Sequence, residues 1–223
     1  MDARLMKLAI AAAALAFGGT ATAQSAGTWL IKAGVNRIAP QVESGDLSPP
    51  SLPGTKIDVE SASSAILTAT YLVTDAVSLE FYTGLPYEHD VVGDGAIAGV
   101  GKLGSVKQVS PTLFAQYRFM PPSSGFRPYV GLGLTYAHFY DEEGSGTLTA
   151  LTNPGGPPTK MSASSAWGLS PQIGVSVKLG ERWYLDASVI KTYIENTNTL
   201  STGQSIDTKL DPLSTNVSIA YRF

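Results

Sequence analysis

Apolar and polar residues alternate along most of the chain with a period of two, and not with the period of about 3.6 of a helix. Between Leu213 and Phe223 one alternate set is mostly apolar, and the other set is small or polar. The segment 167–179 repeats this pattern. Successive side chains of a β-strand point to opposite faces. The pattern therefore predicts strands with one apolar and one polar face.

Eight segments follow this alternation, and they are 9 to 14 residues long. Strands of soluble proteins are most often about 5 to 6 residues long, whereas a tilted strand needs about 9 to 11 residues to cross a membrane. Strand length therefore favours a membrane barrel over the alternative, a soluble β-sandwich. The predicted strands are 29–38, 63–73, 77–85, 107–119, 126–139, 167–179, 183–194 and 213–223.

Short and long connections also alternate along the chain. Short connections lie at 74–76, 120–125 and 180–182, and long ones at 39–62, 86–106, 140–163 and 195–210. Short periplasmic turns and long extracellular loops characterise outer-membrane barrels. The predicted fold is all-β: an eight-stranded antiparallel transmembrane β-barrel with both ends of the barrel chain at the periplasmic side.

The first 23 residues have the features of a secretory signal peptide. Arg4 and Lys7 precede the apolar run 8–17, and Ala21-Thr22-Ala23 fits the small-residue rule for cleavage. The run is too short to span a bilayer, and the alternative is an N-terminal membrane anchor. We predict a cleaved signal peptide at 1–23 and a single barrel domain at 24–223, exported to the outer membrane of a Gram-negative bacterium.

Composition narrows the function. Charged residues make up 15% of the chain, against about 25% in ordinary soluble domains. With 15 Lys and Arg against 18 Asp and Glu, the chain offers no basic field for nucleic acid. It contains no Cys, which excludes disulfides and thiolate metal sites. No motif for a cofactor is present.

Aromatic residues lie on the apolar face near the predicted strand ends. A bilayer favours aromatic girdles at both interfaces, and the alternative is that aromatics simply favour strands. The girdles imply contact with outer-membrane lipids and lipopolysaccharide, where Lys191 could reach a lipid phosphate. The outward aromatics are Trp29, Tyr71, Phe119, Phe126, Trp183, Tyr221 and Phe223 at one rim and Tyr136, Trp167 and Tyr193 at the other.

The last strand ends the chain with Tyr221-Arg222-Phe223, after apolar residues at alternate positions. This arrangement looks like the C-terminal signal that the outer-membrane assembly machinery reads. Tyr221 and Phe223 are the predicted signal residues.

Two neighbouring segments carry a family resemblance. The run 111–119, PTLFAQYRF, is followed by 126–136, FRPYVGLGLTY, and both resemble the OmpW family of small outer-membrane barrels. Tyr71–Asp75 and the terminal Tyr221-Arg222-Phe223 support the match. The resemblance covers essentially all of 24–223. It implies an eight-stranded barrel that takes up small hydrophobic molecules and releases them through its wall into the membrane.

The inward-facing residues divide into two groups by depth. Eight strands enclose room only for side chains or one small ligand, so the strand count argues against a general porin. The extracellular half forms an apolar cup with Ile66, Tyr82, Phe114, Phe139 and Ile190. The periplasmic half forms an ionic floor with Lys32, Glu80, Arg118, Arg127, Lys178, Asp186 and Arg222.

Charges in so narrow a space must pair, and we expect Arg118 and Arg222 to pair with Glu80 and Asp186. A paired floor would block a straight path to the periplasm and direct an apolar solute sideways. Proline removes a donor from a strand ladder, so Pro111 and Pro171, inside two predicted strands, mark lateral openings. The alternatives are harmless bulges at both prolines and a floor that is only the core of a structural barrel.

Other chemistry is weakly supported. His89 with Glu88 and Asp90 forms a poor metal cluster, and His138 has no same-face Ser and carboxylate partner that spacing reveals. The predicted function is a non-enzymatic channel for small hydrophobic solutes. The alternatives are a structural or adhesive barrel and a lipid-active enzyme.

Overall fold

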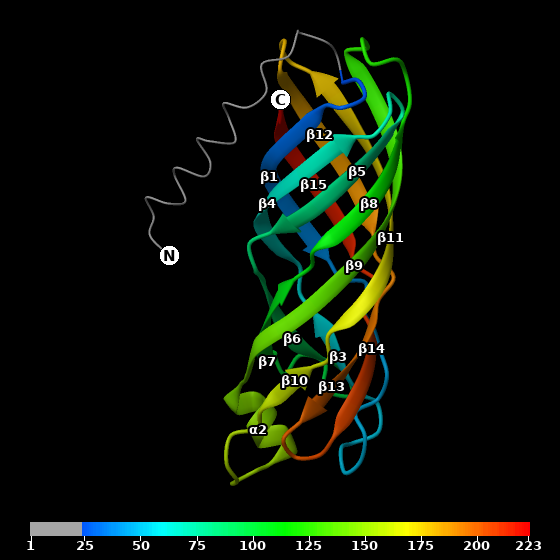
Figure 1. The fold of residues 1–223 in the computed structure, drawn as a ribbon. Coiled ribbons are helices and arrows are strands. Elements are labelled where there is room, and N and C mark those ends of the chain that lie inside the picture. The colour runs from blue at the N-terminus through cyan, green and yellow to red at the C-terminus, as the bar shows by residue number, and fades with distance from the viewer. Residues whose placement is uncertain (1–23) are drawn as a thin grey trace, which may run out of the picture.

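The computed structural model describes residues 24–223 (Figure 1). The predicted signal peptide, 1–23, lies outside the described residues. No helix in the described part of the chain is long and apolar enough to cross a membrane.

Eight long strands form a closed antiparallel barrel, as predicted (Figure 1). Each strand pairs with its neighbour in the ring, and pairing of the first strand with the last and of β9 with β11 completes it. In ring order the strands are β1 (Trp29–Ala39), β4 (Ala62–Leu72), β5 (Val77–Gly84), β8 (Thr112–Arg118), β9 (Phe126–Gly144), β11 (Ala166–Lys178), β12 (Trp183–Lys191) and β15 (Leu213–Arg222).

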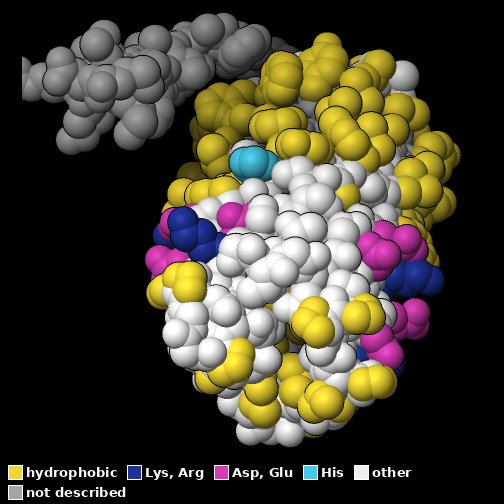
Figure 2. All heavy atoms as spheres, turned by 90° about the horizontal axis from the view of Figure 1, so that it is seen from below, with side chains coloured by type: hydrophobic (Ala, Val, Ile, Leu, Met, Phe, Trp, Pro, Cys, Tyr) yellow, Lys and Arg dark blue, Asp and Glu magenta, His cyan; other side chains and the backbone are white. Residues whose placement is uncertain are grey.

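The alternation of the sequence sets which side chains face lipid and which face the lumen. On β8, Leu113 is 58% exposed whereas the next residue, Phe114, is fully buried. Exposed apolar side chains form a belt around the barrel, which Figure 2 shows in yellow behind the more polar extracellular end. The belt faces the bilayer, and the polar set fills the lumen.

The long connections are not merely loops, because many of their residues form further strands beyond the membrane. β9 continues into a sheet with β7 (Lys102–Val109), β6 (Tyr87–Gly95) and β3 (Thr55–Val59). A second sheet joins β10 (Met161–Ala163), β13 (Glu195–Leu200), β14 (Ser205–Lys209) and β2 (Glu43–Ser44). With the short helix α2 (Gly146–Thr152), these strands enclose a second, extracellular core at the lower end of Figure 1.

The predicted strand 107–119 is wrong as a single element. It is divided at Ser110 and Pro111 into β7, which pairs with β6, and β8, which pairs with β5. The β5–β8 ladder ends at Tyr82 opposite Thr112, and the β6–β7 ladder begins at Tyr87 opposite Gln108. The two ladders are one residue out of register. Gln108 and Thr112 are nevertheless both buried, so the alternation continues across the break and cannot reveal it. The predicted strand 183–194 also ends earlier, at Lys191.

Candidate functional site: two cavities above an ionic floor

One lysine holds the centre of the floor. Lys32 Nζ lies 2.6 Å from Glu80 Oε2 and 3.1 Å from Asp186 Oδ1, and all three side chains are almost fully buried. They come from β1, β5 and β12, which the barrel closure brings around one point of the lumen. A single cation therefore serves two buried carboxylates.

Hydroxyl groups complete the partners of both carboxylates. Thr70 Oγ1 donates to Glu80 Oε2 at 2.6 Å, and the Tyr129 hydroxyl donates to Asp186 Oδ1 at 2.8 Å. Ser176 donates to the other oxygen of Asp186. Buried ion pairs persist only when such additional hydrogen bonds satisfy the charges. The geometry fits a fixed, packed floor.

The two buried arginines of the floor bind neutral groups. Arg118 donates to Ser78 Oγ and Gln116 Oε1, both at 3.0 Å, and stacks 4.8 Å from the centre of the Tyr129 ring. Arg127 donates to the backbone carbonyls of Gln24 at 2.7 Å and Asp75 at 2.6 Å. Every barrel strand contributes a side chain to the connected network of hydrogen bonds and ion pairs. On β15 this is Asn216, which is linked to Gln116 through Ser188 and Gln172.

Two expectations for the floor are wrong. Arg118 and Arg222 do not form ion pairs with Glu80 and Asp186, because the Lys32 amine lies between these two carboxylates. The spacing of residues in the sequence does not show which of the long cationic side chains reaches them. Lys178 is exposed at the periplasmic rim, and in the described chain it forms no ion pair. The end of a strand lets a long side chain turn out to water.

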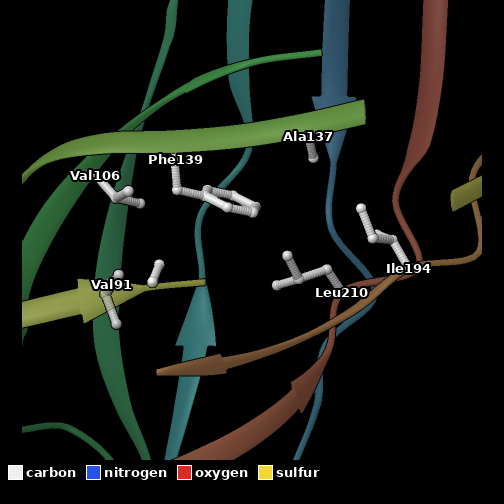
Figure 3. Close-up of a cluster of buried hydrophobic side chains, with 7 residues drawn as sticks. Val91, Val106, Ala137, Phe139, Ile194 and Leu210 are labelled. Carbon is white, nitrogen blue, oxygen red and sulfur yellow. The ribbon is translucent and has the colours of Figure 1, made fainter. Parts of the chain in front are cut away.

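The apolar cup forms directly above the floor, with one exception. Ile66, Tyr82, Phe114 and Ile190 pack together as a buried cluster, and the Tyr82 and Phe114 rings meet edge to face at 6.3 Å. Phe139 is also buried, but it lies farther from the periplasm, in the extracellular core (Figure 3). Because β9 runs past the membrane, its inward residues reach both levels.

The extracellular core contains a cavity of about 120 Å³, here called the outer cavity. Its lining is mostly aliphatic and aromatic, and it extends to Leu52 and Leu151, which are exposed at the tip. Figure 3 shows part of this lining, with side chains from several strands pointing toward one another. The lining includes Ile57, Val91, Leu103, Val106, Phe139, Leu148, Ile194 and Leu210.

A second, smaller cavity of about 40 Å³, here called the inner cavity, lies at the extracellular end of the barrel lumen. Ile38, Gln108, Ile194 and Pro212 line both cavities. The two spaces are therefore neighbours. The rest of the inner lining is more polar and includes Asn36, Tyr82, Tyr87, Thr112, Thr135 and Ser214.

The barrel wall is interrupted beside the inner cavity. In the described chain no backbone hydrogen bond joins 83–86 to 109–111, where the register of the two ladders changes. Gly84 and Ser110, one on each side of the gap, both line the inner cavity. Pro111 keeps its link to β9, because its carbonyl accepts from the Tyr136 N–H at 3.0 Å. On the other edge, the Leu85 N–H donates to the Ala65 carbonyl at 2.9 Å, so each edge of the gap is held by its outer neighbour.

Pro171 produces a smaller interruption on another side of the barrel. It lies inside β11 and pairs with β9, but the regular β11–β12 ladder stops at Gln172 and only the bridge Leu169–Tyr193 lies beyond. On the inner face the Ser170 and Thr192 hydroxyls bond at 2.9 Å across this gap. A side-chain bond thus replaces the missing backbone bond.

The structure also places three further polar side chains that the sequence pattern singled out: His138, Lys191 and His89. His138 Nδ1 lies 2.9 Å from the Oγ of Ser165, a residue in the connection between β10 and β11. Both residues are exposed, and in the described chain no carboxylate forms a hydrogen bond with the His138 ring. The Lys191 amine binds Gln41 Oε1 at 2.5 Å. His89 is buried whereas Glu88 is exposed, so they lie on opposite faces of β6.

Comparison with known proteins agrees with this architecture. The OmpW family matches residues 25–223. Outer membrane protein W of Vibrio cholerae is 31% identical over 90% of this chain and 91% of its own, and that of Escherichia coli K12 is 30% identical over 98% and 100%. The crystal structure of OprG from Pseudomonas aeruginosa superposes with a TM-score of 0.81 at 28% identity, covering 90% of this chain and 98% of that one. The chain belongs to the OmpW family, and it is an outer-membrane β-barrel protein.

Proposed function

We propose that the protein admits small hydrophobic molecules from the outside and releases them sideways into the outer membrane. The observation that carries this proposal is the pair of neighbouring cavities, apolar at the extracellular end, that stand above a buried ionic floor. An apolar solute gains free energy when it leaves water for such a lining.

The floor argues against onward passage to the periplasm. An apolar solute that entered it would separate buried charges from their partners, at a cost of several kcal/mol. The floor also leaves no room for the solute, because its central side chains are almost fully buried. The remaining way out of the inner cavity is the wall.

The gap between 83–86 and 109–111 is the proposed exit. It borders the inner cavity, it lacks cross-strand hydrogen bonds, and its outer side faces lipid, since Leu85 is exposed. An exit here needs no unpairing of a regular ladder. At Pro171, in contrast, a hydroxyl bond already closes the inner face.

The test is to fill the gap. Ser110→Trp places a large ring at the half-buried edge of the inner cavity, whereas Ala115→Trp adds the same ring to the lipid face of β8. The measurement is the initial uptake of radiolabelled decane by cells that express each variant at equal surface level. We expect Ser110→Trp to lower uptake toward that of cells without the protein, and Ala115→Trp to leave it unchanged. Uptake that survives Ser110→Trp would remove the lateral route. Equal uptake with and without the wild-type protein would favour a structural or adhesive barrel.

A further inference from the structure

A buried histidine on β6 lines the outer cavity with a fixed tautomer. His89 is 2% exposed, and its Nδ1 lies 2.8 Å from the backbone carbonyl oxygen of Glu60. A carbonyl oxygen can only accept a hydrogen bond, so Nδ1 carries the hydrogen. In the neutral ring Nε2 is then an acceptor. Burial lowers the pKa of His89, and the Glu60 carbonyl and the Gln108 side chain raise it less.

That acceptor has no hydrogen-bond donor among residues 24–223. His89 Nε2 is buried and makes no hydrogen bond in the described chain. Gln108 lies on the same cavity wall and its side chain interacts with the ring. Its amide nitrogen, however, donates to Ser110 Oγ at 2.5 Å, so the group left for His89 is the amide oxygen, which accepts and cannot donate. A buried acceptor without a donor costs about 1 to 3 kcal/mol. In a mostly apolar cavity, such an atom is a recognition point for a donor supplied by a ligand.

The inner cavity repeats this feature. One of its lining atoms, Asn36 Oδ1, is also buried and has no hydrogen-bond partner among the described residues. The Asn36 amide nitrogen donates to the Tyr87 hydroxyl at 2.9 Å, which leaves Oδ1 as a free acceptor. His89 Nε2 and Asn36 Oδ1 can each accept a hydrogen bond. A solute with one donor would find a partner at both levels of the route.

We infer that the two cavities select apolar molecules that carry a hydroxyl group, such as long-chain alcohols and alkylphenols, over hydrocarbons and ethers. In the outer cavity the hydroxyl donates to His89 Nε2 while the hydrocarbon part contacts the aliphatic lining. This inference rests on the proposed function, because it names the class of solute that the same cavities would take.

The test compares two ligands that differ in one donor. Purified protein in lipid nanodiscs is titrated with 1-decanol and with decyl methyl ether, which keeps the oxygen and lacks the O–H. We expect the alcohol to bind about tenfold more tightly, the value of one satisfied buried acceptor. His89→Phe keeps a ring of similar shape without the acceptor and should bring the alcohol to the affinity of the ether. His138→Phe, on the exposed wall, is the control and should keep the preference.

Nuclear magnetic resonance of isotope-labelled histidine gives a second readout that needs no variant. We expect His89 to show the Nδ1–H tautomer, and its Nε2 resonance to shift on addition of decanol but not of the ether. A proton on Nε2, or equal affinity of the wild-type protein for alcohol and ether, would overturn the inference. Neither result would affect the proposed function, whose test is the uptake of decane. If His89→Phe does not fold, the two wild-type measurements still decide.

Discussion

At the scale of single residues, the cations of the floor differ in the kind of group that they bind. Two carboxylates share the Lys32 amine, whereas Arg118 and Arg127 bind hydroxyl, amide and carbonyl oxygens. The inward position of these charges could be predicted from alternation. Which cation meets which anion could not, because that depends on side-chain reach across the closed barrel.

Lys32→Met should destabilise the barrel strongly. It leaves two buried carboxylates without their cation, and breaking a buried pair costs about 3 to 5 kcal/mol. The control is Lys178→Met, which removes an exposed lysine at the same end of the barrel. The free energy of unfolding in urea, measured in lipid vesicles, checks this expectation. A loss for Lys32→Met no larger than that for the control would contradict the described floor.

His89 should make the extracellular core sensitive to acid. Burial lowers the pKa of the folded form, while that of the unfolded chain stays near about 6.5. Below that value the unfolded form takes up a proton that the folded form resists, so stability falls with pH, by at most about 1.4 kcal/mol per pH unit. Among the groups that contact or face the ring, Glu60 contributes a carbonyl, Gln108 does not titrate, and Tyr87 stays neutral in this range.

Amide hydrogen exchange in β6 and β7, followed from neutral to acidic pH, measures this effect. His89→Phe should flatten the dependence in this range. Exchange that accelerates equally in both proteins would assign the acid sensitivity to another group.

At the scale of elements, alternation predicted the barrel strands well and the ends of strands poorly. The break at Ser110 and Pro111 keeps Gln108 and Thr112 on the inner face, so the sequence pattern runs through it unchanged. The strands in the long connections were missed, because they pair outside the membrane without the long apolar alternation that a bilayer imposes. The outer cavity is lined mainly by this unforeseen part of the fold, whereas the inner cavity is lined mostly by the barrel strands.

Pro171→Val should strengthen the β11–β12 ladder without closing the route. Two residues earlier, the Leu169 carbonyl accepts from the N–H of Tyr193, two residues beyond the end of β12. Residues two apart point their backbone groups the same way, so a new N–H at 171 would also face β12. We expect slower amide exchange in β12 and unchanged uptake of decane. A fall in uptake equal to that of Ser110→Trp would assign the exit to Pro171 instead.

At the scale of the whole molecule, β9 joins the two parts. It spans Phe126–Gly144 and pairs with β8 and β11 in the membrane and with β7 beyond it. The extracellular core is therefore an extension of the barrel wall, and the outer cavity keeps a fixed position over the lumen. The described chain ends beside the first barrel strand, where the Phe223 N–H donates to the Trp29 carbonyl at 3.0 Å.

Deleting Phe223 should impair assembly more than stability. We propose that the assembly machinery reads the alternating end of β15, so the shortened chain should insert poorly into the outer membrane. The control is Phe119→Ala, which removes an exposed aromatic from the same periplasmic rim. The readout is the amount of folded, heat-modifiable protein in outer-membrane fractions. Normal amounts without Phe223 would contradict the proposed signal.

The closed floor also bears on the electrical resistance of the membrane. Ions and hydrophilic antibiotics need a continuous column of water, and the Lys32, Glu80 and Asp186 cluster occupies the lumen where that column would run. A cell can therefore place many copies of this barrel in its outer membrane without a leak current. Under the proposed function, the number of copies is limited by membrane area, and the envelope would gain access to apolar compounds while its barrier to salts and polar toxins stays intact.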